Sequence, residues 1–538
     1  MSQNTADAPP QAAQEGHPRK WLILGVLVFS LLVVVLDNTV LNVALKTISQ
    51  PKPVGLGASQ SDLEWSINSY TLIFAGLLFT WGILADRLGR KRILMLGMGL
   101  FGVTSLLCAY SGSPGELIAA RAAMGFAGAA IMPSTLAVIA NVFPRHEQGK
   151  AIGVWAGSVG LAIAIGPVVG GALLSSFWWG SVFLINVPIV IIGLIAMTFI
   201  VPESRNPNPG KLDPAGVLLS MAGLVVFVYG VIHGGDTGQW GKPAVWGPLV
   251  IGLALTVLFV VWERSSDHPA LDVRLFSNRP FSAAVVSVAL SFFAMMGSLF
   301  FLTFYLQSVR GYTPLQAGLW TLPFAAAQVI FSPLSASVVR RFGARTVSFS
   351  GLLLISIALA LYQLIDVHSA MWVYGLIAAL QGTAMALVMP PATTTVMTSL
   401  PREQAGIGSS INNTVRQVGG ALGVAVLGTI LTSAYRGHIQ PALTGAGVPA
   451  AVAHQVSGSI EATQGFIAQS ASANPKVLQL VTPADQAFVH ALHITTLVGA
   501  GVGVLAALLV LAWLPRRGSG AGTGAAVGAP QAAESVSA

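Results

Sequence analysis

Long apolar blocks alternate with short polar segments along the whole 538-residue chain. The blocks are about 20 residues or longer, which is the length that an α-helix needs to cross the hydrocarbon core of a bilayer. This pattern predicts an all-α polytopic membrane protein with fourteen transmembrane helices. They are expected at residues 21–44, 66–85, 93–112, 115–140, 149–174, 179–201, 213–234, 244–262, 282–308, 314–338, 346–365, 370–395, 405–432 and 490–514.

The basic residues are distributed unevenly between the two sides of such a bundle. Of 27 Lys and Arg residues, 19 fall on the side of the N-terminus, 6 on the opposite side, and 2, Arg121 and Arg416, within predicted spans. Cytoplasmic loops of membrane proteins carry an excess of Lys and Arg. The distribution therefore predicts that both termini are cytoplasmic. The Ala- and Gly-rich, Lys-poor composition is typical of a high-GC bacterium, and we expect the protein in a bacterial plasma membrane.

The composition also excludes several classes of protein. Only 9% of the residues are charged, against about 25% in soluble proteins, and the mean hydropathy is +0.74. The net charge of +8 comes from the loops between spans, so no nucleic-acid partner is expected. The lone Cys108 allows no intramolecular disulfide and no cysteine metal cluster. No Walker lysine loop, HExxH motif or GxSxG turn occurs, so we expect no enzyme, cofactor or metal site.

Two loop sequences recur at a nearly constant spacing. "DRLGRKRI" (86–93) is echoed by "RRFGARTV" (340–347), 254 residues later, and "FPRHEQGKAIG" (143–153) is echoed by "LPREQAGIG" (400–408), about 256 residues later. The repeat predicts two parallel six-helix halves, which is the arrangement of major facilitator transporters. The segments expected are a disordered cytoplasmic N-terminus at 1–20, an N-terminal half at 21–201, an inserted transmembrane hairpin with linkers at 202–281, a C-terminal half at 282–514 with an extracytoplasmic loop at 433–489, and a disordered cytoplasmic tail at 515–538.

Two charged residues lie inside predicted spans of the first half. Asp37 interrupts "LLVVVLDNTVLNVALKTI" (31–48), and Arg121 lies in "LIAARAAMGFAGAAIMP" (117–133). A charge at membrane depth costs several kcal/mol unless it is paired, neutralised or hydrated. The predicted topology places the two at similar depth, toward the outer side. They are candidates for a functional pair, and the alternative is a purely structural ion pair.

The stretch "GILADRLGRKRILMLG" (82–97) is a candidate cytoplasmic gate loop. Gly89 is free to take the positive φ of a tight turn, and the basic residues anchor the loop on the cytoplasmic side. Topology alone does not account for Asp86, which we expect to cap the N-terminus of the thirteenth span. The alternative is a topology anchor only. The candidate residues are Asp86, Arg87, Gly89, Arg90 and Arg92.

The fifth span carries a stripe of small residues in "GVWAGSVGLAIAIGPVVGG" (153–171). Such a stripe lets another backbone approach closely, and Pro167 removes one helical hydrogen bond and permits a bend. Ordinary small-residue packing is the alternative. The residues assigned to this motif are Gly153, Gly157, Gly160, Gly166, Pro167, Gly170 and Gly171.

Further polar and flexible side chains within spans are candidates for a substrate cavity, although they also suit hydrogen bonds between helices. These are Asn38, Asn42, Met132, Tyr305, Gln328, Asn412 and Arg416.

The motifs together resemble the fourteen-span drug:proton antiporter family of the major facilitator superfamily, of the QacA and EmrB type. The similar stretches are "LDNTVLNVAL", "GILADRLGRKRI", "ARAAMGFAGAAIMP", "GVWAGSVGLAIAIGPVVGG", "LINVP", "KLDPAG", "LFSNRPF" and "FYLQSVRGYTPLQAGLWTLP". The resemblance implies proton-coupled efflux by alternating access, with Asp37 linked to proton coupling and Arg121 modulating it. It also assigns Asp86 and Arg90 to the gate loop and residues 166–171 to the antiporter motif.

The chain departs from the family pattern at three points. Ala162 replaces a usual glycine of the antiporter motif, and Arg340 stands where the first half has Asp86. The tenth span has no acid, whereas some relatives that export dications have one there, so dicationic substrates are not expected.

We therefore predict an antiporter, driven by the proton gradient, that exports small amphipathic neutral or monocationic drugs. The protein is expected to be a monomer in the lipid bilayer. One alternative is a dedicated exporter of a single endogenous metabolite. A second alternative is a membrane receptor or scaffold that transports nothing.

Overall fold

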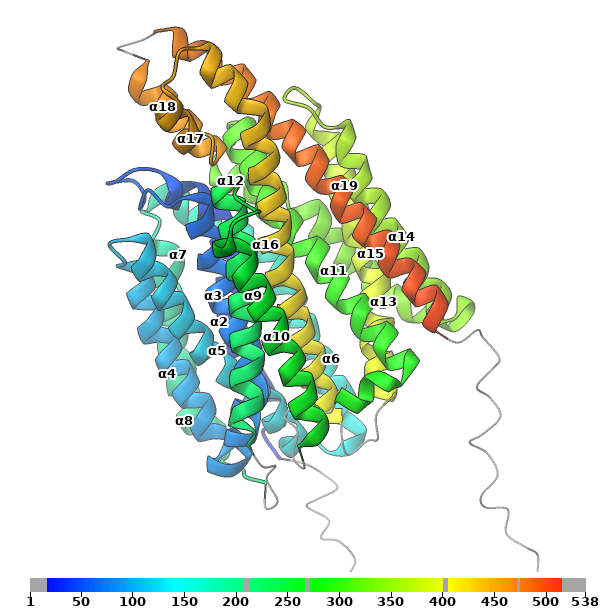
Figure 1. The fold of residues 1–538 in the computed structure, drawn as a ribbon. Coiled ribbons are helices and arrows are strands. Elements are labelled where there is room, and N and C mark those ends of the chain that lie inside the picture. The colour runs from blue at the N-terminus through cyan, green and yellow to red at the C-terminus, as the bar shows by residue number, and fades with distance from the viewer. Residues whose placement is uncertain are drawn as a thin grey trace, which may run out of the picture.

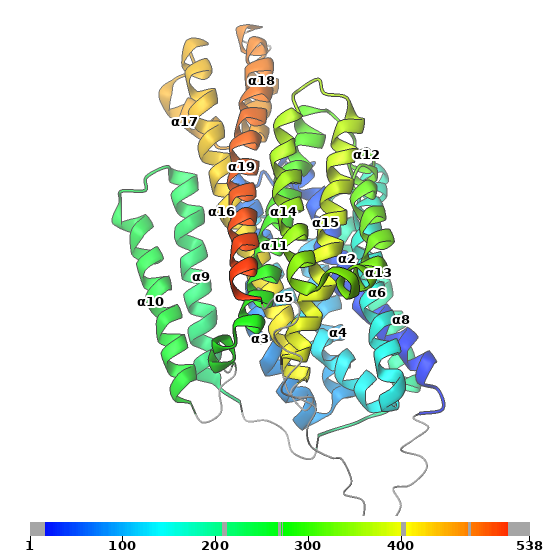
Figure 2. The same ribbon diagram turned by 90° about the vertical axis from the view of Figure 1, so that its right-hand side faces the viewer.

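The computed structural model describes residues 17–206, 212–266, 271, 273–399, 405–471 and 475–514, and this part of the chain contains helices and no strand. The helices form one elongated bundle (Figures 1 and 2). Lys20, at the start of the first helix, and Trp513, at the end of the last, lie at the same end of the bundle, here called the termini end. Helices α17 and α18 project from the opposite end, here called the α18 end.

The first half contains six long helices. Its elements are α2 (Lys20–Ser49), α3 (Gln60–Leu88), α4 (Arg90–Ala109), α5 (Pro114–Val142), α6 (Arg145–Ser176), the single turn α7 (Ser181–Leu184) and α8 (Asn186–Ile200). Polar residues and glycines end one helix and begin the next. Ser59 forms a capping box with Asp62 at the start of α3, and Gly89 has φ +121° between α3 and α4, as the sequence predicts.

A two-helix insertion follows the first half in the sequence, and the second half repeats the six-helix plan. The insertion is α9 (Pro214–Thr237) and α10 (Pro243–Ser265). The second half contains η1 (Val273–Ser277), α11 (Arg279–Phe304), η2 (Tyr305–Val309), α12 (Pro314–Leu319), α13 (Leu322–Phe342), α14 (Ala344–Leu361), η3 (Tyr362–Leu364), α15 (Met371–Thr398), α16 (Ala405–Gly445), α17 (Ala450–Val456), α18 (Ile460–Ser470), η5 (Pro475–Leu480) and α19 (Val481–Trp513). Gly343, which corresponds to Gly89 in the repeat, also has a positive φ of +83°.

All fourteen predicted spans correspond to helical segments. Thirteen described segments are long and apolar enough to cross a membrane. The fifth predicted span is the continuous 32-residue helix α6. The predicted fold class, an all-α bundle of fourteen transmembrane helices, is confirmed.

The hydrophilic segment at 433–489 is more regular than its composition suggests. Helix α16 continues to Gly445, beyond the predicted end at 432, and α19 begins at Val481 rather than at 490. Tyr435 and Ile460 are buried there. The polar faces of these helices lower the mean hydropathy, so a search for apolar blocks ends each membrane span too early.

The inserted hairpin packs against both halves. Helix α9 contacts α10, α3 and α16, and its residue Val228 forms a small apolar cluster with Leu72 of α3 and Ala425 of α16. Most of α10 is exposed, as expected for a helix at the lipid-facing edge of the bundle (Figure 2). The insertion therefore lies outside the two halves without separating them.

The two halves contact each other closely toward the α18 end. Gly171 of α6 lies against the backbone of Leu315 and Pro314 in α12. Gln307 Nε2 of η2 donates a hydrogen bond to the carbonyl oxygen of Val43 in α2 at 2.9 Å, and Lys46 Nζ donates to the carbonyl oxygen of Gln307. These contacts close the interface between the halves at the α18 end.

Candidate functional site

The charged residues that the sequence places inside the first half form a buried ion pair. Arg121 Nη1 of α5 donates to Asp37 Oδ2 of α2. Asp37 is 2% exposed and Arg121 is 1% exposed. The pair satisfies the physical requirement that an ionised group at membrane depth find a partner of opposite charge.

Further polar groups complete this pair. Asn186 Nδ2, at the start of α8, donates to Asp37 Oδ1 at 3.3 Å and to Ser105 Oγ at 3.1 Å. Arg121 Nε donates to the carbonyl oxygen of Ser66 in α3 at 3.0 Å. The pair therefore connects α2, α3, α4, α5 and α8, and a change of its charge affects the packing of the whole first half.

Aromatic rings shield the guanidinium from water. The centre of the Tyr70 ring lies 4.3 Å from Arg121 Cζ, and that of Phe183 lies 5.9 Å away. Cation–π attraction of this kind is worth more in a desolvated site than at a surface. The environment is dry and low in dielectric, so breaking the pair is costly unless the carboxylate takes up a proton.

The candidate gate loop is held within the first half. Asp86 accepts hydrogen bonds from Arg90 Nε at 2.9 Å and from Asn206 Nδ2 at 3.4 Å. Arg90 Nη1 also donates to the carbonyl oxygen of Ala137 in α5 at 3.2 Å. The bond between Asp86 and the N-terminus of the thirteenth span involves residues outside the described part, so it stays a prediction.

The remaining loop residues surround Glu203, which follows α8. Arg92 Nε lies 3.7 Å from Glu203 Oε2, and a Cβ added at Gly89 would lie 2.7 Å from Glu203 Oε1. Gly89 is therefore needed both for its positive φ and for this close approach. Arg87 is exposed at the end of α3.

The small-residue stripe of α6 has different surroundings at its two ends. Toward the α18 end, Gly170 lies against Val40 of α2, Gly166 against Thr39, and Gly171 against α12 of the other half. At Gly153 and Gly157, toward the termini end, an added Cβ would have no atom within 4 Å. The surroundings of Gly160 lie outside the described residues. The stripe thus permits close packing with α2 and α12 over only part of its length.

A cavity of about 90 Å³ lies between the halves. Its lining includes Asn38, the residue that directly follows Asp37 of the ion pair. It is lined by residues of α2, α3, α5, α6, α11 and α16. Four predicted cavity residues line it: Asn38, Asn42, Met132 and Arg416. The other lining residues include Thr39, Thr71, Phe74, Phe292, Met296, Asn413 and Gln417.

Three predicted cavity residues, Tyr305, Gln328 and Asn412, do not line this cavity. Tyr305 is buried in η2, where its hydroxyl donates to the carbonyl oxygen of Asp366 at 2.9 Å. Gln328 lies on α13, which contributes nothing to the lining. Asn412 is buried on another face of α16, while its neighbour Asn413 lines the cavity. A polar run in one helix does not reveal which of its members face inward until the rotation of that helix is known.

A buried acid, Glu64, lies outside the predicted spans. Glu64, one turn into α3, is only 2% exposed, and its Oε2 has no hydrogen-bond partner among the described residues. An added Cβ at Gly428 of α16 would lie 2.8 Å from its Cδ, so this carboxyl group lies at the contact between the halves. The predicted span begins two residues later, at 66, and the acid was therefore assigned to the preceding loop.

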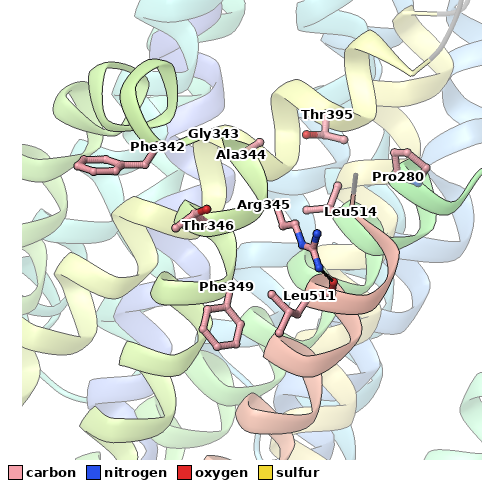
Figure 3. Close-up of a pocket in the computed structure, with 10 residues that line it drawn as sticks. All are labelled: Pro280, Phe342, Gly343, Ala344, Arg345, Thr346, Phe349, Thr395, Leu511 and Leu514. Atoms are coloured by element: carbon pink, nitrogen blue, oxygen red, sulfur yellow. Dashed lines mark hydrogen bonds between the residues drawn. The ribbon is translucent and has the colours of Figure 1, made fainter. Parts of the chain in front are cut away.

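A second pocket, of about 540 Å³, lies at the termini end of the second half. Figure 3 shows its lining, in which Arg345 of α14 donates to the carbonyl oxygen of Leu511 in α19. It contains the loop of Phe342 and Gly343, which repeats the gate loop. None of the predicted site residues lines it, so it is separate from the ion pair and the central cavity.

Two six-helix halves around a cavity, with a buried ion pair beside it, define a helical membrane transporter built from parallel repeats. Residues 27–424 match the family model of the Major Facilitator Superfamily. The chain belongs to this superfamily, which confirms the family resemblance of its motifs.

Named relatives and a solved structure agree with this assignment. The chain is 34% identical to the multidrug efflux pump LfrA of Mycolicibacterium smegmatis, over 92% of the chain and 95% of that protein. It is 33% identical to the tetracenomycin C resistance and export protein of Streptomyces glaucescens, over 80% of each. Its fold resembles the crystal structure of a bacterial homologue of the human lysosomal transporter Spinster, with a TM-score of 0.61 at 18% identity, covering 93% of this chain and 99% of that one.

Proposed function

We propose that the protein exports small amphipathic drugs across a bacterial plasma membrane in exchange for protons. The observation that carries this proposal is the buried pair of Asp37 and Arg121 next to a cavity lined by both halves. The similarity to a multidrug efflux pump and to an antibiotic export protein supports export as the direction of transport.

Asp37 is proposed as the group that takes up and releases the proton. In the paired state its charge is balanced by Arg121 and its second oxygen is bonded by Asn186. A proton on Asp37 removes its charge and weakens the charge-assisted bond to Arg121. The packing of α2 against α5 then changes, and with it the relative free energies of the two transport states.

The neighbouring residues transmit this change to the cavity. Asn38 lines the cavity and directly follows Asp37 on α2, and Thr39 also packs against Gly166 of α6. Ligand pockets for drug-sized molecules usually measure about 300–1,000 Å³, so the present cavity of about 90 Å³ has to widen to bind one. Rocking of the halves about the close contacts of α6 with α2 and α12 would provide that widening.

The termini end is proposed to face the cytoplasm, because the gate loop and the first residues of α2 bring a cluster of basic side chains to that end. Protons then enter from the α18 end. The proton gradient is proposed as the only energy source, with no cofactor, and the transporting unit as a monomer.

Asp37→Asn tests the proposal. We expect this variant to lose energised drug efflux from inverted membrane vesicles with an imposed proton gradient, when vesicles that contain equal amounts of the protein are compared. Asp366→Asn, which alters an exposed carboxylate in the loop before α15, is the matched control and should transport normally. Unchanged drug efflux in Asp37→Asn would overturn the proposed role of this residue.

A dedicated exporter of one compound is the second candidate function. It is favoured by the similarity to the tetracenomycin C resistance and export protein. A resistance panel in a host without its own pumps separates the two functions, since a multidrug pump protects against several unrelated compounds and a dedicated exporter against one. Absence of any gradient-dependent accumulation would instead favour a receptor or scaffold.

A further inference from the structure

The charge of the central cavity comes from Arg416. It is the one charged side chain in the lining, which contains no carboxylate among its described residues. Asp37 does not line the cavity, and its charge is already balanced by Arg121. The cavity therefore presents a net positive charge to any molecule that enters it.

Arg416 has a ring contact but no partner of opposite charge. Its Cζ lies 4.5 Å from the centre of the Phe292 ring on α11. Within the part of the chain that the structure describes, no hydrogen bond or ion pair involves its guanidinium, which has five N–H donors. Arg121, the other arginine inside a span, has both a carboxylate and a carbonyl partner. The donors of Arg416 are thus available to a substrate.

The other polar groups of the lining are the hydroxyls of two threonines and four amides, of which Asn38 and Asn42 have partly used hydrogen-bonding capacity. Asn38 Nδ2 donates to the carbonyl oxygen of Val34 at 2.9 Å, and Asn42 Nδ2 donates to that of Asn38 at 3.1 Å. These bonds along α2 leave the side-chain oxygens of both residues as acceptors. A bound molecule would meet a cationic donor on α16 and neutral acceptors on α2.

The apolar part of the lining suits a flat ring system. Phe74 and Phe292 provide aromatic surfaces, while Met132 and Met296 are flexible and polarisable and adapt to differently shaped ligands. A planar aromatic molecule with a carbonyl, phenolate or carboxylate group matches both the rings and the guanidinium. A permanent cation matches the rings but is repelled by Arg416 in a site of low dielectric.

We propose that Arg416 selects the substrate by charge, binding neutral or singly anionic aromatic compounds with an oxygen acceptor and disfavouring permanent cations. This inference rests on the proposed export function and narrows it. It replaces the neutral or monocationic substrates expected from the sequence with neutral and anionic ones. The alternative is that Arg416 only stabilises the packing of α16 on Phe292.

Two xanthene dyes of similar shape and opposite charge provide the test, namely fluorescein, at a mildly acidic pH where it carries a single negative charge, and rhodamine 123 as the permanent cation. Equilibrium binding to purified protein in detergent is followed by fluorescence anisotropy, without a proton gradient. We expect the native protein to bind fluorescein at least about tenfold more tightly than rhodamine 123, which corresponds to roughly 1.4 kcal/mol.

Substitutions at Arg416 then separate charge selection from packing. Arg416→Gln should lose the preference for fluorescein, Arg416→Lys should keep it, and Arg416→Glu should reverse it. Equal binding of both dyes by the native protein, or an unchanged preference in Arg416→Gln, would overturn the inference. The inference would also be overturned if Arg416→Gln and Arg416→Lys weaken the binding of both dyes equally, since that result indicates that Arg416 only stabilises packing.

A transport assay keeps this inference distinct from the proposed function. Fluorescein uptake into inverted vesicles is measured with and without a proton gradient. Selective binding without gradient-dependent uptake would support charge selection by Arg416 and contradict proton-coupled export. Gradient-dependent uptake of both dyes at equal rates would support export and contradict charge selection.

Discussion

Arg121 on α5 donates a hydrogen bond to Asp37 on α2, and both side chains are almost completely shielded from solvent. Asn186 and the carbonyl oxygen of Ser66 provide the second bond of each partner. Neither charge is therefore left unpaired, although both lie deep within the bundle. This arrangement makes the effect of replacing one partner very different from the effect of replacing both.

Arg121→Gln should destabilise the protein strongly, because it leaves the Asp37 carboxylate buried without a counter-charge. Breaking a buried ion pair from one side typically costs about 3–5 kcal/mol. The double variant Asp37→Asn with Arg121→Gln removes both charges and should lose less than the two single variants combined. Thermal unfolding of the four proteins in detergent gives this comparison, and strictly additive losses would show that the two residues do not interact.

Gly171→Ala should slow transport, since the new Cβ would lie 2.5 Å from Leu315 Cα and 2.6 Å from the carbonyl oxygen of Pro314. These are backbone atoms of the other half, which cannot move aside as a flexible side chain can. Overpacking of this kind costs about 1–3 kcal/mol, enough to disfavour the closed α18 end by roughly fivefold or more. Efflux rates in vesicles provide the measurement.

Gly157→Ala is the matched control for that experiment. It makes the same chemical change in the same helix, but at a position where the added Cβ would have no atom within 4 Å. Transport by Gly157→Ala should remain close to normal. Equal loss of transport in both variants would mean that helix flexibility, rather than contact between the halves, explains the glycines.

The number and type of the helices follow from the sequence because each span has to bury a long apolar segment in lipid. The pairing of Asp37 with Arg121 could also be predicted from the sequence, since each charge needs a partner at a similar depth in the membrane. The hydrogen bond of Asn186 to Asp37 could not be predicted, because Asn186 lies 149 residues from Asp37 and nothing in the sequence marks its amide as a partner. The choice between Asn412 and Asn413 depends on the rotation of α16, which only tertiary packing determines.

Glu64→Met should stabilise the protein. The carboxyl oxygen Oε2 of Glu64 is buried in a contact between α3 and α16, without a hydrogen-bond partner in the part of the chain that the structure describes. An unsatisfied buried polar group costs about 1–3 kcal/mol, and replacing it with an apolar group of similar shape removes that cost. We expect a higher midpoint of thermal unfolding in detergent than for the native protein, with the exposed substitution Glu116→Gln as reference. A lower midpoint for Glu64→Met would show that Glu64 has a stabilising partner.

Glu461, on α18 outside the membrane-spanning segments, should make the stability of the α18 end depend on pH. Burial raises the pKa of this carboxyl group above its usual value, while the hydrogen bond from Ser308 Oγ at 2.6 Å and the charge of Lys46 partly oppose the shift. Asp485 of α19 is joined to the same group of residues through Gln464, whose Nε2 donates to Asp485 Oδ1 at 3.3 Å.

The sign of the pH effect follows from this raised pKa. The folded protein retains a proton on Glu461 at pH values where the unfolded chain has released it. The stabilisation is therefore complete below the pKa of the unfolded state, near 4.3, and is lost as the pH rises through the higher pKa of the folded state. The midpoint of thermal unfolding of the native protein, minus that of Glu461→Gln, should accordingly fall as the pH is raised from about 4 to 7. A difference that stays constant or increases over this range would contradict the assigned role of Glu461.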